Sequence, residues 1–146
     1  MSANTPPLEH NDAAVLQHMA MYQSIISRMA NNSSACKNWS IVLVSAFLAF
    51  VIEKGKGDIA WLGMIPIVIF WFLDASYLAL EKKFRAAAKV SADKIHASNF
   101  KLVDLFVVEV DGKIPAQLYK GFFSWATWPV YGGLLVLLLL AMLWGM

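Results

Sequence analysis

The sequence has few charged residues and few of the side chains that build catalytic or metal sites. Asp, Glu, Lys and Arg make up 15% of its 146 residues, whereas apolar residues make up 59%. A soluble domain carries more charge than this, so the composition favours a membrane protein. Cys36 is the only cysteine, which excludes an internal disulfide and a cysteine-based metal cluster.

The common motifs of enzymes and nucleic-acid-binding proteins are missing as well. The spacing of His10, His18 and His96 matches no metal site, and Gly55-Lys56-Gly57 lacks the spacing of a phosphate-binding loop. No nucleophile lies in a recognisable pattern with a base, and no acid pair suits hydrolysis. A net charge of +2 is too small to indicate nucleic acid. We therefore expect no catalytic residues, no cofactor, no metal and no nucleic-acid partner.

Three long apolar stretches are present instead. A helix needs about 20 apolar residues to cross a bilayer. Residues 59–80 carry a single charge, Asp74, and residues 128–146 carry none. The uncharged stretch 39–52 reaches crossing length if it begins at Ser34, with Lys37 extending its ammonium group towards the lipid headgroups. The sequence thus predicts transmembrane helices at 34–52, 59–80 and 125–146, the first two joined by a turn at 53–58.

The positions of the basic residues predict the orientation. Most of the 12 Lys and Arg residues lie between the second and third apolar stretches or in the N-terminal arm. Basic residues near membrane helices mark the cytoplasmic side. We therefore expect a cytoplasmic N-terminus, a periplasmic C-terminus and no cleavable signal peptide, because residues 1–38 contain no sustained apolar run.

The N-terminal arm divides into two parts. Residues 1–10, with Pro6-Pro7, are expected to form a flexible tail, and residues 11–33 an amphipathic cytoplasmic helix. Its apolar residues recur at steps of four and three along one face: Val15, Met19, Tyr22, Ile26 and Met29. This face is a candidate surface for a protein partner or a second copy; it could equally pack on the other cytoplasmic segment.

The segment 81–124 is expected to begin as a basic helix that continues the second span. Its residues 101–110 are β-branched and aromatic, which predicts a short β segment. A strand needs a partner, either a return strand after Asp111-Gly112 or the same segment of a neighbouring subunit. Pro115 limits the first option, so we favour the second. The predicted class is an all-α membrane protein with three transmembrane helices, a small cytoplasmic helical layer and this β segment.

Asp74 and Lys37 are the candidate gating or ion-pair residues. A charge inside a membrane helix is costly and needs a partner or water. The spacing places Asp74 in the inner third of the bilayer and Lys37 at a comparable depth, so the two can pair. The alternatives are that Asp74 gates or lines a pore in a proton-sensitive way, or that it stays unpaired and reaches towards the headgroups.

Other residues of the spans and of the basic segment are weaker candidates. Gly63, Gly132 and Gly133 suit close helix packing, and Pro66 predicts a kink in the middle of the second span, with a hinge as the functional alternative. A basic cluster follows that span and could contact anionic lipid or an acidic ligand, or only set the orientation. Its members are Lys82, Lys83, Arg85 and Lys89.

Several segments together resemble a widespread family of small bacterial membrane proteins. They are residues 16–19, 28–33, 37–40, 70–77 leading into Glu81 and Arg85, 123–125 and 128–131. Some members resemble transmembrane effectors encoded with antiphage modules, in which membrane disruption stops the growth of an infected cell. The resemblance implies location in a bacterial inner membrane. Ala75-Ser76 departs from the glycine or aromatic residue often found there, and a partner would have to supply any nucleotide sensing.

These observations lead to three functional hypotheses. The first is an oligomeric inner-membrane effector that permeabilises or deforms the membrane, because three helices enclose no pore and several copies would be needed. The second is a non-catalytic scaffold or accessory subunit that recruits a cytoplasmic protein through the Val15–Met29 face. The third is a small transporter, for which one membrane carboxylate without internal repeats is thin support.

Overall fold

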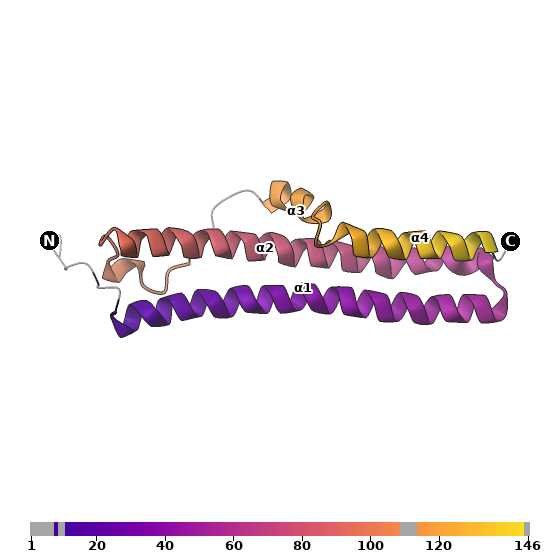
Figure 1. Ribbon diagram of the computed structural model, residues 1–146, viewed down its shortest axis with the longest axis horizontal. Helices are drawn as coiled ribbons and strands as arrows, with labels where there is room; N and C mark the ends of the chain where they lie inside the picture. The colour runs from indigo at the N-terminus through magenta and orange to yellow at the C-terminus, as the bar shows by residue number, and fades with distance from the viewer. Residues whose placement is uncertain (1–7, 9–10, 109–113, 145–146) are drawn as a thin grey trace. The chain divides into compact units, whose positions relative to one another are not determined.

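The computed structural model describes residue 8 and residues 11–108 and 114–144, and it is helical throughout its regular parts (Figure 1). No strand occurs among these residues. The elements in chain order are α1 (Ala13–Lys54), η1 (Gly57–Gly63), α2 (Met64–His96), η2 (Leu102–Asp104), α3 (Ile114–Phe122) and α4 (Trp128–Trp144). The chain forms two compact units: a first unit of Met1–Met29 with Leu80–Lys113, and a second unit of Ala30–Ala79 with Ile114–Met146.

Helix α1 is long because no glycine or proline interrupts it before residue 55. Gly55 then adopts a φ of 60°, a left-handed conformation that glycine reaches without steric cost. The Gly55 N–H donates to the Ile52 carbonyl and the Lys56 N–H to the Val51 carbonyl, both at 3.2 Å. This is the Schellman arrangement that ends helices. The predicted turn at 53–58 therefore begins with a defined helix C-terminus.

Pro66 lies in the first turn of α2, directly after the 3₁₀ helix η1. In a first turn the missing proline N–H leaves no hydrogen bond unmade. The sequence placed this proline in the middle of one continuous helix and predicted a kink there. The structure instead changes from 3₁₀ to α geometry at Gly63–Met64, just before the proline.

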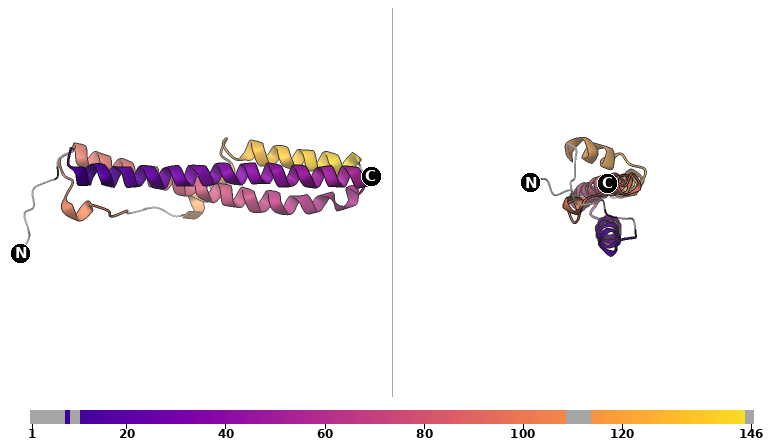
Figure 2. Two further views of the ribbon diagram at one scale, coloured as in Figure 1. Left: turned by 90° about the horizontal axis from the view of Figure 1, so that it is seen from below. Right: turned by 90° about the vertical axis from the view of Figure 1, so that its left-hand side faces the viewer.

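The core of the second unit joins α1, α2 and α4, which run alongside one another there (Figure 2). Its buried residues are Val44, Ile67, Tyr131, Leu134 and Leu138. Outside this core the same helices expose large apolar side chains, for example Ile52 at 69%, Val68 at 57% and Leu143 at 69%. Soluble proteins seldom expose apolar surface over such an extent.

Two helical stretches are long and apolar enough to cross a membrane. They are Ala13–Lys54 and the continuous run Gly57–His96. Helix α4, which corresponds to the third predicted span, is apolar but has only 17 residues.

The first unit has a smaller core, in which Tyr22 and Ile26 of α1 pack with Ala88 of α2 and with Val108. The predicted β segment is wrong over residues 101–108: η2 lies there, and the rest has no regular structure. Asp104 accounts for the tight turn, because it accepts the Lys101 N–H at 2.9 Å and also pairs with Lys94. Residues 109–110 and the Asp111-Gly112 turn lie outside the described residues, as does the predicted tail 1–10 apart from Leu8.

Candidate functional site

Lys37, Asp74 and Ser33 form a buried polar cluster in the second unit. The Lys37 Nζ lies 2.8 Å from both carboxylate oxygens of Asp74, and its geometry is that of a hydrogen bond only towards Oδ1. The Ser33 hydroxyl donates to the same Oδ1 at 2.5 Å and accepts from Lys37 at 2.9 Å. Asp74 is fully buried, whereas 20% of the Lys37 side chain is exposed.

The helix period explains why this cluster forms. Ser33 and Lys37 are four residues apart on α1 and so lie on the same face, opposite Asp74 of α2. The structure thus brings Lys37 and Asp74 into the contact expected from the sequence. The sequence analysis missed Ser33, although its spacing from Lys37 was a usable signal. Lys37 and Ser33 thus each donate a hydrogen bond to the Asp74 carboxylate.

Of the three candidate packing glycines, Gly63 alone lies against another helix in the described chain. A methyl group added to Gly63 would collide with side-chain atoms of Leu138 on α4 and Phe47 on α1. Gly132 is adjacent only to Trp128 of its own helix, and Gly133 has open space beside it. Gly63 thus lies at a close contact between helices, whereas no other helix of the described chain lies within 4 Å of a Cβ added at Gly132 or Gly133.

Three of the four basic candidates after the second span are exposed, and the fourth is buried. Lys82 and Lys89 are exposed, and Arg85 pairs with Glu81 at 2.6 Å. Lys83 is buried, with 5% of its surface exposed. Successive residues of a helix point in different directions, which separates Lys83 from its neighbours.

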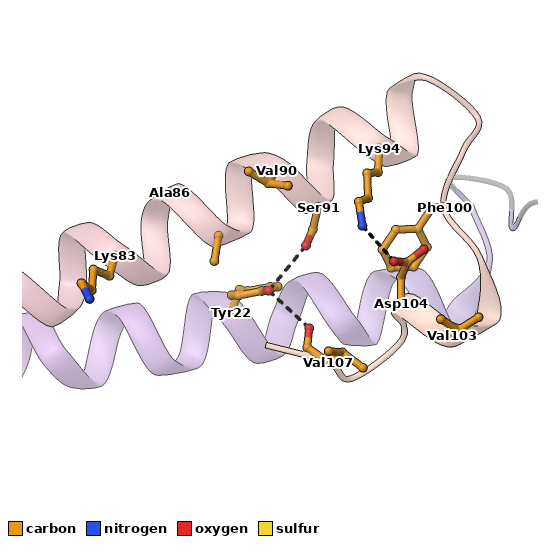
Figure 3. A pocket seen from close by; sticks show the side chains of 11 residues that line it. Tyr22, Lys83, Ala86, Val90, Ser91, Lys94, Phe100, Val103, Asp104 and Val107 are labelled. Carbon is orange, nitrogen blue, oxygen red and sulfur yellow. Dashed lines mark hydrogen bonds and ion pairs between the residues drawn. The ribbon is translucent and has the colours of Figure 1, made fainter. Parts of the chain in front are cut away.

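Lys83 lines a pocket of about 330 Å³ in the first unit (Figure 3). The pocket lies between the ends of α1 and α2 and the segment that contains η2, and Val90, Phe100 and Val107 form part of its apolar wall. At its centre the Tyr22 hydroxyl lies 3.5 Å from the Ser91 hydroxyl and from the Val107 carbonyl.

Two lining residues of this pocket, Lys94 and Asp104, form an ion pair. Lys94 contacts Asp104 at 2.9 Å. Hydrogen bonds from the Lys94 side chain and the Lys101 backbone lower the pKa of Asp104, so its carboxylate stays ionised at neutral pH. Lys94 and Asp104 thus line the pocket as an ion pair.

The candidate partner face on α1 is used inside the chain. Val15, Tyr22 and Ile26 are 2%, 1% and 9% exposed, and Met19 and Met29 are half-buried. The face packs on the 81–124 segment through Ala88 and its neighbours, which was one of the two alternatives. In this structure the chain itself therefore covers most of the face, and its role as a surface for a partner or a second copy stays a prediction.

His18 is a buried residue whose environment the sequence analysis missed. It is 0% exposed, and its Nδ1 accepts the N–H of Phe106 at 3.0 Å. Its Nε2 has no hydrogen-bond partner among the described residues. The rings of Tyr22, Phe100 and Phe106 surround it at centroid distances of 5.1, 5.3 and 6.2 Å. His18 therefore holds Phe106, whose φ is 58°, in a backbone conformation that non-glycine residues seldom adopt.

We expect His18 to make the first unit less stable in mild acid. Burial lowers the pKa of His18 from 6.5, and the opposing effect of the Asp104 carboxylate is smaller. As the pH falls through about 6.5, the unfolded chain binds a proton that the folded imidazole does not, so stability decreases. Amide hydrogen exchange of residues 100–108 should accelerate between about pH 7 and about pH 5.5, after correction for the intrinsic exchange rate.

His96 supplies the control for this prediction, because it is exposed. His96→Gln should keep the pH dependence, and His18→Gln should lose it. Equal pH dependence in both variants would assign the effect to another group.

No family model matches the chain, and no curated protein or solved structure matches it. Among the described residues, no group of three or more His, Cys, Asp or Glu side chains could hold a metal ion.

Proposed function

We propose that this chain is an integral protein of the bacterial inner membrane that acts as an oligomeric effector, permeabilising or deforming the membrane when triggered. The observation that carries the proposal is the buried Lys37–Asp74 pair between two helices whose outer surfaces are apolar. A charged side chain inside a membrane bundle is costly, so it is usually paired and usually has a functional or orienting role.

Three membrane crossings are part of this proposal. Helix α4 has 17 residues and a length of about 26 Å at 1.5 Å per residue, close to the hydrocarbon thickness of a bilayer. A slightly short helix can be accommodated by local thinning of the bilayer. With three crossings, the basic residues of the N-terminal arm and of the 81–124 segment lie on one side, which the positive-inside rule makes the cytoplasm.

An oligomer is required for any conducting state. Side chains such as Val44, Ile67 and Leu138 fill the space between the helices of the second unit. A filled bundle of three helices leaves no path for ions, so several copies would have to line one. The apolar outer residues can contact either lipid or a second copy.

In this proposal the Lys37–Asp74 pair holds the resting arrangement of α1 against α2. A buried ion pair is favourable only in one geometry, and separating it leaves a costly unpaired charge. A trigger that stabilises another arrangement of the helices therefore has to break the Lys37–Asp74 contact and replace it with other interactions. The chain resembles a family of small bacterial membrane proteins, some of whose members resemble antiphage effectors, and this resemblance favours the same class of activity.

The scaffold hypothesis depends on the Val15–Met29 face as the surface that recruits a cytoplasmic protein. Val15, Tyr22 and Ile26 of the Val15–Met29 face are buried in the first unit, so a partner could reach these three residues only if that unit opened. The transporter hypothesis gains no supporting observation from the described residues.

Membrane potential in bacteria tests the proposal. Wild type and Asp74→Asn are expressed at matched levels, and the potential is followed with a voltage-sensitive dye. We expect the two proteins to differ, with depolarisation by only one of them, because Asp74→Asn removes the charge that Lys37 neutralises. Lys89→Gln is the matched control, since it removes an exposed charge and should behave as wild type. Unchanged potential with both correctly inserted proteins would exclude a pore that opens unaided.

A further inference from the structure

Helix α3 carries an exposed aromatic surface that has no partner within the described second unit. Tyr119 and Phe123 lie one helical turn apart, their ring centroids are 5.0 Å apart, and they are 67% and 63% exposed. Trp125, in the turn that follows, is 84% exposed. Lys120 lies beside this aromatic pair in the sequence and is exposed as well. Tyrosine, tryptophan and lysine together are typical of the layer between lipid tails and water.

The C-terminal end of α3 is held firmly against α2. The Trp71 Nε1–H donates to the Phe122 carbonyl at 3.2 Å. The backbone of Gly121 passes so close to Ala75 that an added Cβ would lie 2.7 Å from the Ala75 carbonyl oxygen. The Thr127 hydroxyl donates to the Gly121 carbonyl at 2.6 Å and so fixes the turn into α4. The aromatic surface therefore has a defined level along α2, between Trp71 and Ala75.

This position between Trp71 and Ala75 does not coincide with the end of the apolar stretch 59–80. Leu80, the last residue before Glu81, lies five residues beyond Ala75 and so about 8 Å further along the helix axis. Helix α4 begins at Trp128, next to the same level, and its length matches a hydrocarbon core that starts there. The start of α4 and the aromatic surface of α3 thus mark the same boundary.

We propose that α3 lies in the headgroup layer of the cytoplasmic leaflet, and that the hydrocarbon core ends near Ala75 rather than near Leu80. The occupant of the aromatic surface is the lipid bilayer itself. Continuity with α4 favours lipid over a protein partner, because the chain passes from the exposed Trp125 directly into an apolar helix. This inference rests on the membrane insertion in the proposed function.

A hydrocarbon core that ends near Ala75 changes the depth of the candidate site in the bilayer. Asp74 and Lys37 then lie at the edge of the hydrocarbon core instead of within its inner third. The Lys37 side chain is 20% exposed, so at this depth a lipid phosphate can approach the ammonium group that pairs with Asp74. A lipid headgroup can therefore compete with Asp74 for Lys37, which gives the resting contact a direct sensitivity to the membrane.

Spin-label depth measurements test this inference. Single cysteines are placed at Tyr119, Phe123 and Leu80 in a Cys36→Ala background, labelled with a nitroxide, and the protein is reconstituted in nanodiscs. Accessibility to oxygen, which concentrates in lipid, is compared with accessibility to a water-soluble nickel chelate. Leu140→Cys serves as the reference for lipid and Lys89→Cys as the reference for water, since both native residues are exposed.

We expect the oxygen-to-nickel ratio at positions 119 and 123 to be several-fold above that of the water reference and below that of Leu140→Cys. Leu80→Cys should give a lower ratio than both. The inference is overturned if labels 119 and 123 behave like the water reference, or if both are shielded from oxygen and nickel, which would indicate a second copy over the surface. A water-like Leu140→Cys would instead show that the chain does not insert, and would refute membrane insertion itself.

Discussion

Lys37→Met should lower the free energy of unfolding by about 3 kcal/mol, because it leaves the Asp74 carboxylate buried and unpaired. The value is taken at the lower end of the range for buried ion pairs, since a fifth of the Lys37 side chain is exposed. The Ser33 hydroxyl still donates to the carboxylate and limits the loss. Unfolding by denaturing detergent in mixed micelles, followed by circular dichroism, measures the change.

A double-mutant cycle separates the interaction energy of Lys37 with Asp74 from the effect of each substitution alone. Lys37→Met with Asp74→Leu removes both charges and replaces them by side chains of similar size, so it should recover most of the lost stability. If the double variant is as unstable as the sum of the two single variants, the two residues do not interact and the resting contact proposed above is absent. Lys82→Met is the control for loss of a lysine charge at an exposed position.

Gly121→Ala is expected to have the second large effect, a loss of about 1–3 kcal/mol through overpacking. The added methyl carbon would lie 2.7 Å from the backbone oxygen of Ala75. The position of a Cβ is fixed by its own backbone, and the Ala75 oxygen is main chain, so no side-chain rotation can relieve the collision. We expect α3 to move away from α2, and the hydrogen bond from Trp71 to the Phe122 carbonyl to break. Tryptophan fluorescence and the same unfolding experiment report the two effects.

Gly133→Ala is the matched control. It is the same substitution in a neighbouring helix, but nothing lies within 4 Å of the added carbon. Alanine favours a helix over glycine by about 0.5–1 kcal/mol, so this variant should be as stable as wild type or slightly more stable. Equal losses for both variants would assign the effect of Gly121→Ala to helix geometry and not to its contact with Ala75.

The periodicity of the sequence predicted the helices of this protein better than it predicted the contacts that each helix makes. The helical class is confirmed, and so is the presence of apolar helices long enough to cross a membrane. The β segment at 101–108 was wrong because propensity was outweighed by local hydrogen bonds: Asp104 caps a 3₁₀ turn and pairs with Lys94. The position of Pro66 in the first turn of α2 was not predicted, because the sequence does not show that a 3₁₀ helix precedes the proline.

The amino-acid sequence by itself determined the apolar helices, the face on which Val15 to Met29 fall, and the pairing of Lys37 with Asp74. Each follows from composition or from the helix period, which are local properties. Only the tertiary structure decided that Ser33 joins the ion pair, that His18 is enclosed by aromatic rings, and that α3 docks beside Ala75. These contacts join residues far apart in the chain, and they depend on how side chains of different helices fill the space between them.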